Sequence, residues 1–93
     1  MKARTKRQKE IWNEASNIAK EIERSYPGTE IEVSLETQEG EDAYLWITTS
    51  REMINQIRVF AAELTTRLYE TKGIDVIPRM DIFTPAVEIT VTK

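Results

Sequence analysis

The chain has 93 residues, of which 40% are apolar and 31% charged, and its net charge is −3. This length and composition predict one globular domain, residues 1–93, and exclude a disordered chain. The absence of cysteine and histidine excludes disulfides, thiol catalysis and histidine-based acid–base or metal chemistry. No apolar run is long enough for a membrane span or a signal peptide, so we expect a small cytoplasmic protein.

The first half of the chain predicts a helix followed by a hairpin. Apolar residues recur at spacings of three and four over residues 9–26, which is typical of an amphipathic helix, and a Pro-Gly pair ends the pattern. Residues 30–37 alternate between apolar and acidic or polar side chains, as in a half-buried strand. A loop over residues 38–42, with Gly40 at positive φ, then leads to a second strand over residues 43–48.

The second half predicts another helix with two further strands. The segment Thr49–Glu52 has the sequence of a capping box and precedes a regular apolar stripe that ends at Gly73. Residues 74–83 read as a strand, but Pro78 lacks a backbone N–H and therefore confines that strand to a sheet edge or a bulge. Residues 86–92 alternate again and predict a fourth strand.

The element order αββαββ predicts an α+β fold in two layers, with both helices on one face of a four-stranded mixed or antiparallel sheet. We expect the strand order first-second-fourth-third, with the fourth strand parallel to the second. This order places the proline-containing strand and the acidic first strand at the two edges. The result is a circularly permuted ferredoxin-like α/β plait, a fold that serves many unrelated functions.

Basic residues are concentrated at the start of the chain. Five of the 13 basic residues and none of the 16 acidic ones precede residue 10, so residues 10–93 carry a net charge of −8. The segment 1–9 is therefore either a basic arm that contacts an anionic partner or the solvated start of a helix. Because cations oppose the dipole at a helix N-terminus, we expect its first residues to fray. The five basic residues are Lys2, Arg4, Lys6, Arg7 and Lys9.

The sequence carries no recognisable catalytic motif. With three glycines in the whole chain, no phosphate-binding loop can be built. The acidic cluster of Glu39, Glu41 and Asp42 lies in a turn and matches no calcium-binding pattern. The carboxylate pair of Asp75 and Asp81 would need burial to do acid–base chemistry. We therefore predict a protein that is not an enzyme and that uses no metal or cofactor.

The helix-free face of the sheet is the most informative surface. If Leu45 and Ile47 point toward the helices, Tyr44 and Trp46 stand on the opposite face of a central strand. The third strand adds apolar atoms to that face in either orientation. One orientation presents Pro78, Met80 and Ile82, and the other presents Ile77, Arg79, Asp81 and Phe83. An apolar open face suggests a partner, unless terminal segments cover it. The predicted protein interface is Tyr44, Trp46, Met80 and Ile82.

Two functions fit these features. The preferred hypothesis is a small protein-interaction module that forms a homodimer, or binds another protein, through the open sheet face or a sheet edge. The alternative is a nucleic-acid-binding protein in which the basic residues of segment 1–9 contact phosphates and Trp46 stacks on a base. Acidic side chains on the neighbouring strands oppose this alternative, because they would repel a polyanion. These residues are Glu30, Glu32, Glu36 and Glu88.

Overall fold

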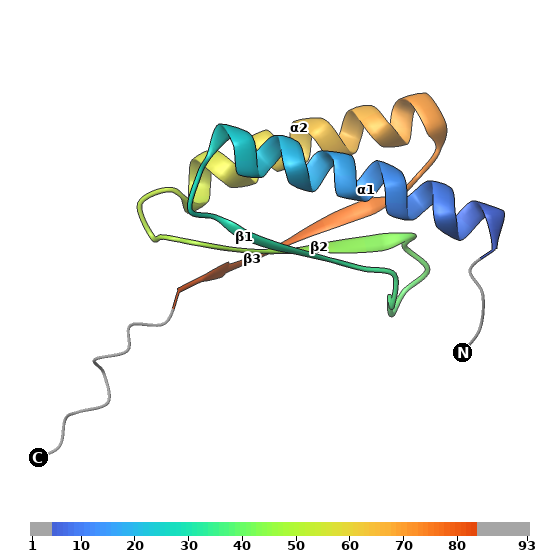
Figure 1. Cartoon of the computed structure of the whole chain (residues 1–93), viewed down its shortest axis with the longest axis horizontal. Coiled ribbons are helices and arrows are strands. Elements are labelled where there is room, and N and C mark those ends of the chain that lie inside the picture. Colours follow the sequence, from blue (N-terminus) through green and yellow to red (C-terminus); the bar gives the residue numbers. More distant parts are fainter. Residues whose placement is uncertain (1–4, 84–93) are drawn as a thin grey trace, which may run out of the picture.

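The computed structural model describes residues 5–83, which form two helices and a three-stranded sheet. Both helices lie on one face of the sheet, so this part of the chain has the expected two-layer α+β architecture (Figure 1). Residues 1–4 and 84–93, which include the predicted fourth strand, lie outside the described residues. The elements are α1 (Lys6–Ser25), β1 (Glu30–Ser34), β2 (Ala43–Thr49), α2 (Ile54–Lys72) and β3 (Val76–Ile82).

The sheet has the order β1-β2-β3, which corrects the predicted order. β2 pairs with β1 in antiparallel fashion and with β3 in parallel fashion. Both edges of β2 are therefore occupied, and no fourth strand can lie between β2 and β3 as the ferredoxin-like order requires. The physical reason is the β2-α2-β3 crossover. A helix that packs on the sheet returns the chain to the end where β2 began, and the next strand then pairs beside β2 in the same direction.

α1 begins earlier than the apolar pattern suggested. Thr5 caps the helix, and its hydroxyl accepts a hydrogen bond from the Gln8 N–H at 3.1 Å. The Gln8 side chain accepts one from the Thr5 N–H at 2.9 Å, which completes a capping box. This box offsets the unfavourable cations of the first turn. Lys6, Arg7 and Lys9 therefore belong to the helix and not to a separate arm.

The start of α2 differs from the prediction. Thr49 does not cap the helix, because it continues β2 and is buried with its hydroxyl oxygen 3.4 Å from that of Thr29. The chain instead turns at Ser50, whose carbonyl accepts from the Met53 N–H at 3.1 Å, and α2 begins at Ile54 without a side-chain cap. A β-branched residue extends a strand readily, and this preference prevails here over capping. The predicted end is confirmed, since Gly73 follows α2 with φ 69°.

The hydrophobic core lies between the two helices and the central strand. Ala43, Leu45 and Ile47 of β2 are fully buried and point toward the helices. α1 covers them with Ile11, Ala15, Ile18, Ala19 and Ile22, which all belong to the predicted apolar stripe. Because β2 is central and its inward residues are wholly enclosed, the opposite side of the same strand is held in a rigid position.

Candidate functional site

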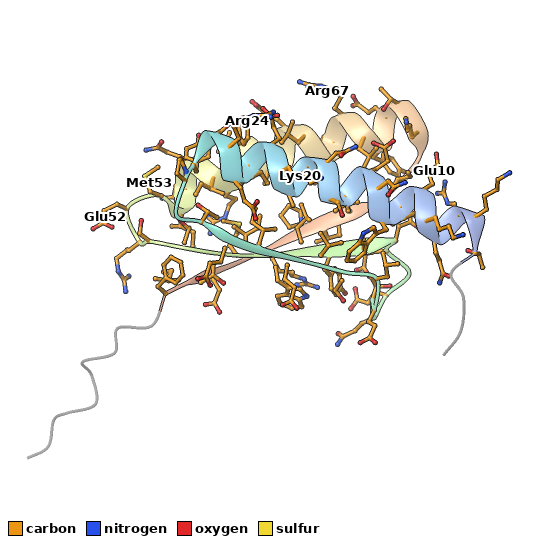
Figure 2. The ribbon with its side chains drawn as sticks, viewed as in Figure 1. Glu10, Lys20, Arg24, Glu52, Met53 and Arg67 are labelled. Atoms are coloured by element: carbon orange, nitrogen blue, oxygen red, sulfur yellow. The ribbon has the colours of Figure 1, made fainter. Side chains whose placement is uncertain are left out.

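The face of the sheet that no described helix covers is the candidate site (Figure 2). Side chains alternate along each strand, and residues in register share a face. Since Leu45 and Ile47 point to the helices, their neighbours and the residues in register with those neighbours point away from the helices. We call this surface the open face. Its residues are Glu30, Glu32 and Ser34 of β1, Tyr44, Trp46 and Thr48 of β2, and Ile77, Arg79 and Asp81 of β3.

Trp46 stands near the centre of the open face. It lies in register with Glu32 of β1 and Arg79 of β3, and 45% of it is exposed. A shallow pocket borders its ring and is lined by Glu30, Ile31, Glu32, Trp46 and Thr48. A tryptophan usually hides most of its ring, so this position offers a large apolar surface to a partner.

Tyr44 lies beside Trp46 but is only 3% exposed. The two rings meet edge to face with their centroids 5.7 Å apart and an interplanar angle of 85°. The guanidinium of Arg79 lies 4.8 Å from the centroid of the Tyr44 ring. This corrects the expectation that Tyr44 is an exposed contact residue: it is buried and supports Trp46 from one side.

The hydroxyl of Tyr44 fixes the loop between β1 and β2. It donates to the Glu41 carboxylate at 3.2 Å and accepts from the Gln38 N–H at 3.3 Å. It also accepts from Arg79 Nη2 at 3.4 Å. Two of these three hydrogen bonds hold the loop against the end of the open face, and the third joins the same hydroxyl oxygen to β3. Sequence periodicity could not reveal this, since the contacts join residues of the loop, β2 and β3.

The contacts around the carboxyl of Glu41 shift its pKa. The pKa of Glu41 lies below its ordinary value of 4.5, mainly because its own backbone N–H hydrogen-bonds to the carboxylate. Desolvation is the second largest effect and raises this pKa, whereas the Glu39 N–H, the Tyr44 hydroxyl and the positive charge of Arg79 each lower it by a smaller amount. Deprotonated Glu41 therefore stabilises the fold above pH 4.5, and this contribution is lost as the pH falls through the lowered pKa.

Replacing Tyr44 with phenylalanine tests this network. The variant should lose about 0.5–1.5 kcal/mol of unfolding free energy at pH 7, because the Tyr44 hydroxyl no longer bonds its half-buried and exposed partners. The loss should be smaller at a pH below the lowered pKa of Glu41, where the protonated carboxyl no longer favours the fold. Urea unfolding at both pH values measures the difference. An NMR titration should show the Glu41 pKa rising toward 4.5 in the variant, and an unmoved pKa would contradict the assigned hydrogen bond.

Met80 and Ile82 are the predicted interface residues that the structure places elsewhere. Met80 is in register with Ile47 and packs against the core, and Ile82 is in register with buried Thr49. Both therefore lie on the helix-covered face. The third strand instead contributes Ile77, Arg79 and Asp81 to the open face. The signal was present in the sequence, because every second residue from Ile74 to Ile82 is apolar and such a run belongs to the core side.

The basic residues of segment 1–9 do not join the open face where the structure describes them. Arg7 lies 3.6 Å from Asp42 and 3.8 Å from Glu10, and it donates to the Gly73 carbonyl at 3.4 Å. It thereby links α1, the loop before β2 and the end of α2. Lys6 and Lys9 belong to the same helix, which packs on the face of the sheet opposite to the open face (Figure 1). Lys2 and Arg4 lie outside the described residues.

The acidic turn residues make hydrogen bonds within the loop, to β2 and to the segment before β3. Asp42 Oδ2 accepts from the Asp75 N–H at 2.8 Å, and Glu41 accepts from Tyr44. Residues 5–83 contain no group of three or more metal-ligating side chains. No helix within these residues is long and apolar enough to cross a membrane.

Comparison of the chain with known protein families, with curated proteins and with solved structures gave no match. The function is therefore inferred from the open face and its chemistry.

Proposed function

We propose that the chain is a non-enzymatic protein-interaction module that binds a basic segment of another protein on the open face, with Trp46 as the anchor. The observation that carries this proposal is the half-exposed ring of Trp46 near the middle of the central strand. Tryptophan is among the residues that contribute most to protein interfaces, especially at their centre.

The position of Trp46 is fixed before any partner arrives. Tyr44 packs edge to face against the indole, and the core encloses the other side of β2. A side chain held in this way loses little conformational entropy on binding. Ordering of the Trp46 side chain therefore offsets little of the free energy that the indole contributes to binding.

The charges around Trp46 indicate the chemistry of the partner. Three carboxylates and one guanidinium lie on the open face, from Glu30, Glu32, Asp81 and Arg79. Arg79 already interacts with the Tyr44 ring and hydroxyl. A partner with lysine or arginine beside apolar side chains complements this surface. Two copies of the open face would instead oppose like charges, and a nucleic acid would be repelled. For this reason we favour a different protein over a second copy at this face.

Peptide binding tests the proposal. The chain with Trp12→Phe has Trp46 as its single tryptophan, so its fluorescence reports on the open face alone. An eight-residue peptide of alternating lysine and leucine should shift the Trp46 emission to shorter wavelength and saturate. The same peptide with glutamate in place of lysine should not bind. A single-stranded oligonucleotide that saturates the Trp46 signal would overturn the proposal in favour of the nucleic-acid alternative. A Trp46 emission that none of the three probes changes would also contradict the proposal.

A pair of charge variants sharpens the test. Glu32→Lys should weaken binding of the basic peptide by about tenfold at low salt, because a contact charge is reversed next to Trp46. Glu23→Lys makes the same charge change on an exposed position of α1 and should leave binding almost unchanged. Equal effects of the two variants would show that only net charge matters and that the open face is not the binding site.

A further inference from the structure

β1 lies at one edge of the sheet, with β2 as its only neighbouring strand among residues 5–83. The Phe83 N–H donates to the Thr49 carbonyl at 3.0 Å, so Thr49 directs its backbone groups toward β3. Backbone groups of successive residues in a strand point to alternate sides. The even-numbered residues of β2, including Trp46, therefore direct their N–H and C=O groups toward β1.

The pairing of β1 with β2 leaves backbone groups of β1 directed away from the sheet. Glu32 is in register with Trp46, so its backbone groups point toward β2. By the same alternation, the N–H and C=O groups of Ile31 and Val33 point outward. An extended segment that lies along this edge can form hydrogen bonds with all four of these groups.

The side chains on the two sides of β1 define the pattern of such a segment. Ile31, Val33 and Leu35 pack against the core on the helix side but are only half-buried. On the open face, Glu30 and Glu32 are exposed, and neither forms an ion pair within the described part of the chain. Because residues in register on neighbouring strands share a face, the added segment would alternate apolar with basic side chains.

We infer that the basic segment of the partner binds as an additional strand along the outer edge of β1, an inference that rests on the proposed function. The added strand would lie about 10 Å from β2, a distance that a lysine or arginine side chain and the indole of Trp46 span together. The pocket beside the indole is lined by Glu30, Ile31, Glu32, Trp46 and Thr48, and thus by residues of both β1 and β2. A basic side chain that crosses Glu32 lies in this pocket, where its cation contacts the indole and the carboxylates.

A second copy of the chain does not suit this edge. Two antiparallel β1 strands in full overlap would place Glu32 opposite Glu32 of the other copy. A shift of the register by two residues would place Glu30 opposite either Glu32 or Glu36. Like charges directly opposite one another are destabilising, so each of these arrangements is unfavourable.

The predicted fourth strand of the same chain does not reach this edge over residues 86–92. The chain leaves the described sheet at the end of β3, which is three strand spacings, or about 14 Å, from a strand added to β1. The three steps from Phe83 to residue 86 span at most about 11 Å. A segment of another protein is therefore the occupant that the edge favours.

Amide hydrogen exchange on the ¹⁵N-labelled chain tests the inference with the alternating lysine-leucine peptide. The N–H groups of Ile31 and Val33 should exchange fast in the free chain, and saturating peptide should slow both by at least about tenfold. The Glu32 N–H, which points toward β2, should exchange slowly in both states and is the internal control.

The outcomes separate this inference from the proposed function. If the peptide shifts the Trp46 emission but leaves exchange at Ile31 and Val33 unchanged, the added strand is wrong and the proposed function stands. If the peptide does not bind, both are wrong. Slow exchange of Ile31 and Val33 in the free chain would show that the edge is already covered, which would also overturn the added strand.

Two modified peptides test the backbone hydrogen bonds and give the orientation of the added strand. Methylation of the amide nitrogen of every leucine, or of every lysine, removes donors from one side of the extended peptide and keeps its charge. In antiparallel addition the leucines bond directly to Ile31 and Val33, so leucine methylation should weaken binding at least about 30-fold and lysine methylation less than about threefold. Parallel addition reverses the two effects. Equal effects of the two modifications would contradict strand addition.

Discussion

Replacing Leu45 with alanine should lower the free energy of unfolding by about 3–5 kcal/mol. Leu45 is fully buried, lies on the central strand and packs in the core beneath the two helices. Truncation removes its buried methyl groups and leaves a cavity that flanking strands cannot collapse to fill. A domain of this size has a total stability of about 5–10 kcal/mol, so the loss is a large part of the total and well within what unfolding measurements resolve. Urea unfolding followed by circular dichroism measures the loss.

Val59→Ala is the matched control. It also removes methyl groups from an aliphatic side chain, but 59% of Val59 is exposed. The control should change the unfolding free energy by less than about 0.5 kcal/mol at concentrations where the chain is monomeric. If Leu45→Ala were no more costly than Val59→Ala, the central position of β2 would be wrong.

Replacing Trp46 with serine should weaken binding of the basic peptide at least about 30-fold, as expected for a central tryptophan anchor. The fold should remain, because the indole is half-exposed and its loss opens no internal cavity. Calorimetric titration measures the affinity without relying on the fluorescence of the residue that was removed.

Tyr69→Ser provides the control for Trp46→Ser. It removes an exposed aromatic side chain on the other side of the molecule and should leave peptide affinity unchanged. Unchanged peptide affinity in Trp46→Ser, with an intact circular dichroism spectrum, would show that the indole is not the anchor.

Local patterns predicted the helices and strands of the described region well. The apolar stripe of α1, the alternation of β1 and the glycine at the end of α2 each depend on residues within a few positions of one another. Such patterns report which side of an element is buried, and the core residues of α1 and β2 follow from them. The predicted start of α2 was wrong, because Thr49 fits both a helix cap and the end of a strand. Its pairing with β3 favoured the strand.

The strand order and the role of Tyr44 depend on contacts between distant segments. Edge chemistry suggested that the proline-containing strand lies far from β2, yet an edge position beside β2 satisfies Pro78 equally within the described sheet. Alternation assigns Tyr44 to the open face, and this assignment is correct. The expectation that Tyr44 is exposed there was wrong. Its burial comes from the loop, Trp46 and Arg79, which no periodicity encodes. The site was therefore predictable as a face but not as an arrangement of contacts.

Chemical-shift mapping of the basic peptide on the ¹⁵N-labelled chain tests the role of the open face most directly. The indole N–H of Trp46 and the backbone amides of Glu32, Arg79 and Asp81 should move on titration, because these residues surround the anchor. The amides of α2 between Val59 and Tyr69 should stay in place. Movement confined to the start of α1 or to α2, with the Trp46 indole unchanged, would contradict a binding site on the open face.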